Sequence, residues 1–116
     1  MRDAHALSPI NTSGDELAFW LYSSGSTGLP KGVRHIHSSL QATSETFGQQ
    51  VLGIKQDDVV YSAATLFFAY GLGNAMSFPM SAGATTLIFA NRPTPAVVTN
   101  ILVTWQPTIF WGVPTL

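Results

Sequence analysis

The chain of 116 residues has the length of one ordinary domain, yet only 9% of its residues are charged, against about 25% in a typical soluble domain. Its net charge of −1 gives no electrostatic basis for binding nucleic acid or an anionic membrane. The chain has three histidines and no cysteine, so the sequence predicts neither a disulfide framework nor a metal site.

The charge deficit is concentrated in one half of the chain. From Val59 to Leu116 the only charged residue is Arg92, whereas a domain that folds alone distributes charge over its surface. We therefore expect the missing remainder of a larger domain to cover this half. Glycines and Pro79 interrupt its apolar runs, so none provides the roughly 20 continuous residues of a membrane-spanning helix. No signal-peptide pattern is present, and we expect a cytoplasmic protein.

The first part of the chain predicts a tail followed by two strands. Residues 1–14 are polar and lack periodicity, which indicates a flexible tail ahead of a partial domain at 15–116. Leu17–Tyr22 is an apolar, aromatic run that is typical of a buried strand. A segment rich in glycine and hydroxyl residues follows, and Val33–His37 then predicts a second strand.

A first helix is predicted directly after that strand. Ser38 and Ser39 can cap its start, and Gly53 suits its end. Apolar residues recur between them at helical spacing, namely Leu40, Phe47 and Val51.

The remainder of the chain alternates between strands and helices. The predicted strands are Val59–Ala64, Ala84–Ala90 and Thr108–Gly112. The predicted helices are Gly71–Ala82, interrupted or bent by Pro79, and a segment from Pro93 and Pro95 to Trp105. This alternation predicts an α/β fold with a largely parallel sheet covered by helices on both faces, as part of a larger protein of several subdomains.

The segment Ser23–Gly32 has the composition of an anion-binding loop. Its ten residues include three glycines, four hydroxyl residues and one lysine. Glycines let backbone N–H groups approach a ligand closely, successive N–H groups form a concave anion site, and a lysine adds a positive charge suited to phosphate. It differs from the Walker P-loop, because Gly32 follows Lys31 and a strand is predicted next. Composition alone leaves open a flexible surface loop.

The order of these residues decides between the two interpretations. Tyr22–Val33, which reads YSSGSTGLPKGV, resembles the signature of the adenylate-forming, AMP-binding superfamily, and the following stretch to Leu40 is similar to the family's continuation. The resemblance implies that this loop holds the β- and γ-phosphates of ATP. The residues implied in that role are Ser23, Ser24, Gly25, Ser26, Thr27, Gly28 and Lys31.

A second resemblance concerns the acid that is activated. Leu66–Asn74 is similar to the stretch that lines the ring pocket in benzoate- and hydroxybenzoate-CoA ligases, which implies a substrate pocket at Ala69, Tyr70 and Gly71. The end of the chain from Trp111 resembles the family strand that runs beneath the substrate. The chain has no Asp or Glu after Val59, and a buried ammonium group without a carboxylate partner is very costly. We therefore expect an acid without an ammonium group.

Other aromatic residues near this stretch have simpler interpretations. We expect Phe67 and Phe68 to lie in the core, because aromatic side chains dominate protein cores. His35 and His37 alternate on one strand, which favours packing or capping over chemistry.

The resemblance implies a two-step reaction with ATP, Mg²⁺ and coenzyme A. The carboxylate of an aromatic acid attacks ATP to give an acyl-adenylate and pyrophosphate, and coenzyme A then displaces AMP. Lys31 would stabilise the leaving pyrophosphate. The family's metal and adenine motif and its catalytic lysine have no match in this chain, so we expect no turnover by the chain alone. Two alternatives remain open: a non-catalytic phosphate- or nucleotide-binding module, and a ligase for another non-amino carboxylic acid.

Overall fold

The computed structural model describes residues 7–25 and 28–114. The strands in this part of the chain are β1 (Leu17–Ser24), β2 (Pro30–Ile36), β3 (Val59–Ser62), β4 (Thr85–Leu87) and β5 (Ile109–Trp111). The helices are α1 (Ser38–Thr43), the π-helical η1 (Ser44–Val51), α2 (Ala69–Leu72), the π-helical η2 (Gly73–Ser77), α3 (Phe78–Ala82) and α4 (Pro95–Trp105). Within these described ranges, no helix is both long and apolar enough to cross a membrane.

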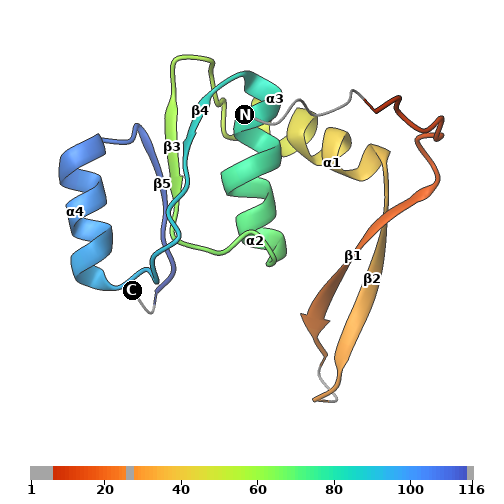
Figure 1. The fold of residues 1–116 in the computed structure, drawn as a ribbon, viewed down its shortest axis with the longest axis horizontal. Helices are drawn as coiled ribbons and strands as arrows, with labels where there is room; N and C mark the ends of the chain where they lie inside the picture. Colours follow the sequence, from red (N-terminus) through yellow and green to blue (C-terminus); the bar gives the residue numbers. More distant parts are fainter. Residues whose placement is uncertain (1–6, 26–27, 115–116) are drawn as a thin grey trace.

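β1 and β2 form an antiparallel hairpin that extends beside the rest of the molecule (Figure 1). Leu17 pairs with Ile36 at one end and Ser24 with Pro30 at the other, with an irregularity in register between Leu17 and Phe19. Both predicted strands are confirmed, although β2 begins three residues before the predicted Val33. The prediction that the first strand is buried is wrong for the described chain, because most residues of β1 are exposed. The short connection explains the antiparallel pairing, because parallel neighbours need a crossover of a dozen or more residues.

The other strands form a parallel sheet with the order β4-β3-β5. Figure 1 shows α4 on one side of this sheet and the continuous segment α2-η2-α3 on the other. This arrangement confirms the predicted α/β class with helices on both faces. All three strands run in the same direction, so their carboxyl ends meet at one edge of the sheet, at the bottom of Figure 1.

The core follows from the alternation of side chains along β3. Val60 is completely buried and packs with Ile54 and Phe78 on the side of the α2-η2-α3 segment. Its neighbour Tyr61 packs on the other face with Val98 of α4. Successive side chains of a strand point to opposite faces, so these two residues anchor one helical layer each.

The first helical segment differs from its prediction in cap and buried face. His37, not a serine, occupies the N-cap position, and its side chain makes no capping hydrogen bond. The buried residues of η1 are Ser44 and Gly48. A Cβ at position 48 would lie 3.1 Å from Cβ of Phe78, so a small residue is needed where the two helical segments meet. Of the predicted apolar face, Leu40 is partly buried, whereas Phe47 and Val51 are exposed.

The predicted boundaries elsewhere hold to within a few residues. The helical segment predicted from Gly71 begins at Ala69 and continues through Pro79, which lies in the first turn of α3. α4 is capped by Thr94, whose hydroxyl accepts from the Val97 N–H at 3.4 Å. The strands β4 and β5 are shorter than predicted. Residues 1–6 of the predicted tail lie outside the described residues, and its flexibility stays a prediction.

Candidate functional site

The glycine- and hydroxyl-rich segment connects the two strands of the hairpin. Ser23 pairs with Lys31 and Ser24 with Pro30, so two of the predicted phosphate-binding serines and the predicted lysine lie on adjacent strands at the base of the connection. Ser26 and Thr27, which were also predicted to bind phosphate, lie outside the described residues.

Two glycines give this connection its geometry. A Cβ at Gly25 would lie 2.9 Å from the carbonyl oxygen of Leu29 and 3.0 Å from Cε of Lys31, so the lysine side chain passes directly over a position that only glycine fits. Gly28 has φ of +81° and donates its N–H to the carbonyl oxygen of Gly25 at 3.0 Å. Positive φ is readily adopted by glycine alone. The sequence Gly25-x-x-Gly28 therefore closes a tight turn beneath Lys31.

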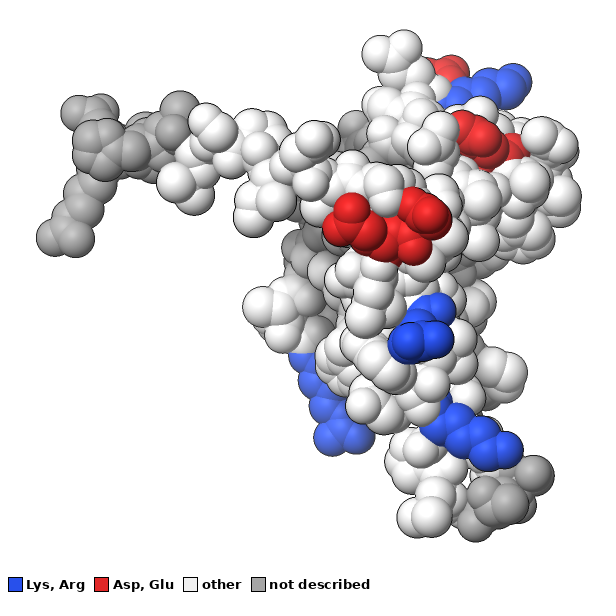
Figure 2. Space-filling view, turned by 90° about the vertical axis from the view of Figure 1, so that its right-hand side faces the viewer, with Lys and Arg blue, Asp and Glu red and all other residues white. Residues whose placement is uncertain are grey.

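The hairpin end of the molecule has an electrostatic character that suits an anion. Lys31 is exposed, and no ion pair is found in the described part of the chain. On the face of the molecule drawn in Figure 2, the acidic side chains lie in the upper part, whereas the lower part has basic side chains and no acidic one. An exposed ammonium group without a carboxylate partner is available to a phosphate group.

A cavity of about 260 Å³ lies between the start of the α2-η2-α3 segment, η1 and the end of β5. It contains two of the three predicted pocket residues, and its lining consists of Phe47, Ala69, Tyr70, Gly73, Asn74, Phe78 and Trp111. None of these residues is charged, so the cavity suits an uncharged, mostly apolar group.

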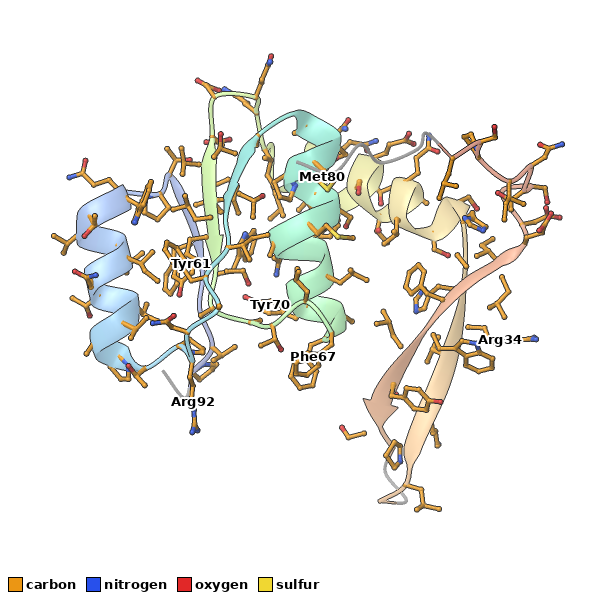
Figure 3. The ribbon with its side chains drawn as sticks, in the orientation of Figure 1. Arg34, Tyr61, Phe67, Tyr70, Met80 and Arg92 are labelled. Carbon is orange, nitrogen blue, oxygen red and sulfur yellow. The ribbon has the colours of Figure 1, made fainter. Side chains whose placement is uncertain are left out.

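Tyr70 connects the helical wall of this cavity to the sheet. Its hydroxyl donates to the carbonyl oxygen of Gly112 at 3.2 Å. Its ring meets Trp111 edge to face, with centroids 6.3 Å apart and planes at 90°. Figure 3 shows Tyr70 on the side of its helical segment that faces the sheet. The hydrogen bond and the ring contact hold both side chains in place at the cavity.

The third predicted pocket residue, Gly71, does not line this cavity. It is buried, and a Cβ at this position would lie 2.1 Å from the carbonyl oxygen of Thr65. Gly71 therefore permits the start of α2 to pack against the preceding loop, and it positions its neighbours Ala69 and Tyr70.

Five lining residues were not among the predicted pocket residues: Phe47, Gly73, Asn74, Phe78 and Trp111. Phe78 is wedged between two glycines, because a Cβ at Gly48 or Gly73 would come within 3.1 Å or 2.8 Å of it. One signal was available in the sequence. Tyr70, Asn74 and Phe78 are four residues apart, the spacing that places side chains on one side of a helix.

The interpretation of Phe67 and Phe68 as core residues is wrong. Phe67 is 74% exposed and Phe68 is 57% exposed. Both lie in the connection from β3 to α2, and Figure 3 shows Phe67 pointing away from the ribbon. Phe67 borders a second cavity of about 260 Å³ at the carboxyl ends of β3 and β4, together with Tyr61 and Phe89.

The two histidines of the hairpin region have structural roles. His35 stacks on Phe19, with ring centroids 4.9 Å apart and planes at 4°. His37 is exposed and donates its backbone N–H to the carbonyl oxygen of Glu16 at 3.1 Å. In the described ranges, no cluster of His, Cys, Asp and Glu could hold a metal ion.

Comparison with known proteins places this geometry in a family. The family described as "AMP-binding enzyme" matches residues 2–116. The chain belongs to the AMP-binding enzyme family. The predicted family is thereby confirmed.

Curated relatives of this AMP-binding chain include ligases of aromatic acids. The chain is 59% identical over 105 residues to a benzoate–CoA ligase of Thauera aromatica, a match that covers 90% of the chain and 20% of the relative. It is 53% identical over 108 residues to a 4-hydroxybenzoate–CoA/benzoate–CoA ligase of Rhodopseudomonas palustris, covering 93% of the chain and 20% of the relative. The chain thus spans about a fifth of the length of these relatives.

Solved structures agree with the fold. A benzoate CoA ligase from Burkholderia xenovorans LB400 matches with a TM-score of 0.82 and 51% identity, over 90% of this chain and 20% of that chain. The anthranilate CoA ligase AuaEII, solved in complex with anthranoyl-AMP, matches with a TM-score of 0.83 and 33% identity, over 95% of this chain and 21% of that chain.

Proposed function

We propose that this chain provides the phosphate-binding loop and the aromatic-acid pocket of an ATP-dependent, AMP-forming acid–CoA ligase for a benzoate-like acid. The observation that carries the proposal is the uncharged cavity walled by the rings of Phe47, Tyr70, Phe78 and Trp111. The names of three relatives, ligases of benzoate, of 4-hydroxybenzoate and benzoate, and of anthranilate, support the same substrate class.

The cavity lies beside the edge of the sheet at which ligands are expected. Tyr70 donates its hydroxyl hydrogen to Gly112, directly after the carboxyl end of β5. The carboxyl ends of β3, β4 and β5 meet at one edge of the sheet, and ligands of parallel α/β sheets bind outside the carboxyl ends of the strands. A ring held in the cavity would direct its carboxylate out of the mouth, toward a nucleotide held by the hairpin.

The proposed reaction has two steps. The carboxylate attacks the α-phosphorus of ATP, which breaks the bond to the bridging oxygen and releases pyrophosphate. The thiolate of coenzyme A then attacks the acyl carbon and releases AMP. Phosphoryl chemistry of this kind depends mainly on positioning and charge stabilisation. Ser23, Ser24 and the ammonium group of Lys31 would bind the β- and γ-phosphates, and Lys31 would offset the negative charge that develops on the leaving pyrophosphate.

Magnesium enters this proposal only as the counter-ion of ATP. The described residues contain no group of acidic or histidine side chains that could hold it. Hydroxyl oxygens of the loop could contact an ATP-bound Mg²⁺, which keeps several water ligands and prefers substrate phosphates. We propose a cytoplasmic location, where ATP and coenzyme A are available to such a ligase.

The cavity also accounts for the class of acid. Its walls have no carboxylate that could pair with a substrate ammonium group, and burying an unpaired ammonium is very costly. An aryl ring, by contrast, can contact the faces and edges of the surrounding rings. The proposed substrate is therefore an aromatic acid without an α-amino group.

The test uses a chimera in which residues of this chain replace the matching segment of the benzoate–CoA ligase of Thauera aromatica. We expect the chimera to release pyrophosphate with benzoate and ATP, and Lys31→Ala to slow this release by about 10²–10³-fold. Lys55→Ala, which removes an exposed lysine before β3, is the matched control and should leave the rate unchanged. An equal rate for Lys31→Ala and the chimera would refute the role of the loop.

The chain by itself provides a second test. We expect no pyrophosphate release by the 116-residue chain alone with benzoate and ATP, because the family's remaining motifs have no match in it. Turnover by the chain alone would contradict this expectation. No observation on the described residues favours a non-catalytic binding module.

A further inference from the structure

The two faces of the β1-β2 hairpin carry different residues next to the phosphate-binding loop. Ser23 pairs with Lys31, so both side chains lie on one face. Tyr22 pairs with Gly32, and these two residues lie on the other face, because successive side chains of a strand point to opposite faces. The face of Ser23 also carries Phe19, which borders a small cavity together with residues of α1 and α2. Lys31 therefore extends from the face of the hairpin that is turned toward the helices.

Two aromatic rings pack on Gly32 on the opposite face of the hairpin. A Cβ at Gly32 would lie 3.1 Å from Cε3 of Trp20 and 3.3 Å from Cε1 of Tyr22, so the two rings occupy the space that a side chain would need. Trp20 is 51% exposed and Tyr22 is 71% exposed, and rings this exposed contribute little to a buried core. Their contact is with the residue that directly follows Lys31. Aromatic rings that cover a glycine on the neighbouring strand fix the pairing of the two strands.

The register of the hairpin decides on which face Lys31 lies. A slip of one residue moves every side chain of a strand to the opposite face, and glycine-rich strands specify their register weakly. The connection between β1 and β2 contains Gly25 and Gly28, and Gly32 follows in β2. A two-stranded hairpin is also only marginally stable by itself. A slip would move Lys31 away from Ser23, so a contact that fixes the register also fixes the position of the ammonium group.

We propose that Trp20 is a positioning residue for the phosphate-binding Lys31. The ring of Trp20 packs with that of Tyr22 on Gly32 and holds the two strands in the register in which the lysine lies opposite Ser23. The inference rests on the proposed function, because it assumes that Lys31 binds the phosphates of ATP. The role of Trp20 is therefore confined to the formation of the acyl-adenylate. The later attack of coenzyme A on the adenylate involves neither the β- nor the γ-phosphate.

The experiment measures the two half-reactions separately in the chimera described above. The first is the release of pyrophosphate from benzoate and ATP, and the second is the formation of benzoyl-CoA from benzoyl-adenylate and coenzyme A. Because a displacement of about 1 Å can slow a reaction by about 10²-fold, we expect Trp20→Ala to lower kcat/KM for ATP at least about tenfold. The rate of the second half-reaction should stay unchanged.

Two further substitutions separate positioning from a general loss of structure. Trp20→Phe keeps a ring beside Gly32 and should restore most of the rate of the first half-reaction. Trp105→Ala is the matched control, because it removes a tryptophan ring of similar exposure, 55%, from the end of α4. It should leave the ratio of the two rates unchanged.

Gly32→Val tests the same contact from the other strand if Trp20→Ala does not fold. Its side chain takes the space of the Trp20 ring and should also lower kcat/KM for ATP. In the double variant the two losses should not add, because both substitutions remove one contact. Equal losses in the two half-reactions, or an unchanged first half-reaction, in a folded Trp20 or Gly32 variant would overturn the inference. An unchanged rate for Lys31→Ala would instead overturn the proposed function, and this inference with it.

Discussion

Replacing Gly71 by alanine should destabilise the protein rather than alter the pocket directly. A Cβ at this position would lie 2.1 Å from the carbonyl oxygen of Thr65 and 2.9 Å from that of Ala64. Cβ atoms essentially never approach another heavy atom within 3.0 Å, so the loop must move by about 0.9 Å. The Thr65 carbonyl accepts the N–H of Phe68 at 3.2 Å, so this movement also disturbs the turn that starts α2.

The cost can be estimated from the type of contact. Overpacking of a well-packed site costs about 1–3 kcal/mol of stability. Because a clashing backbone carbonyl cannot rotate away as a side chain can, we expect Gly71→Ala to cost about 3 kcal/mol. In domains of 150–250 residues, 1 kcal/mol lowers Tm by about 2–4 °C, so we expect Gly71→Ala to lower Tm by about 6–12 °C. Gly14→Ala is the control, because a Cβ there would lie at an ordinary 3.7 Å from the Ser38 side chain.

The assay is thermal unfolding of the chimera and its two variants, followed by tryptophan fluorescence. The same variants are then compared for the ratio of kcat/KM between benzoate and 4-hydroxybenzoate at a temperature where all are folded. Gly71 does not line the cavity beside Tyr70, so this ratio should change little. A Tm equal to that of Gly14→Ala, or a large change in the ratio without a loss of Tm, would refute the packing role.

Three further predictions concern stability and the pocket. Hydrogen bonds from the Lys55 backbone N–H and the Thr108 hydroxyl hold the pKa of Asp58 below its ordinary 3.8. The resulting stabilisation is complete above that value and is lost as pH falls through the lower folded pKa. The difference in Tm between the unsubstituted protein and Asp58→Asn should therefore shrink from pH 6 to pH 3, and a constant difference would contradict this. Val60→Ala should cost about 2 kcal/mol in urea unfolding, because Val60 is completely buried, whereas Val103→Ala, at a 71% exposed position, should stay within about 0.5 kcal/mol. Tyr70→Phe keeps the ring contact with the sheet and should leave kcat/KM for benzoate within about threefold, whereas Tyr70→Ala should lower it at least about tenfold; equal values for the two variants would show that the ring is not needed.

Local signals in the sequence predicted most of the elements. The aromatic run at Leu17–Tyr22 and the apolar run from Val59 are strands because aromatic and β-branched residues favour extended backbone, although only the second run is buried. Pro95 at the start of α4 and the left-handed Gly53 after η1 indicated these boundaries correctly. Each of these signals depends only on a residue and its immediate neighbours.

The parts that could not be predicted depend on contacts between distant segments. The sequence does not show that Gly48 faces Phe78, thirty positions later, and this contact reverses the expected buried face of the first helical segment. Trp111 likewise joins the cavity only because β5 pairs with β3, which brings its ring to Tyr70. Phe67 and Phe68 were assigned to the core from residue type alone, whereas their exposure is set by the absence of a covering element among the described residues.

Glycines and aromatic residues have different roles in forming the cavity beside Tyr70. Gly48 and Gly73 leave no free space around Phe78, and Gly71 fixes the start of the helix that carries Tyr70. Phe78 is thus held by close packing against the backbone at these glycines, and Tyr70 by its hydrogen bond to Gly112. Substitutions at the glycines should consequently change stability first, whereas truncation of the Tyr70 ring removes a wall of the cavity and should change turnover first.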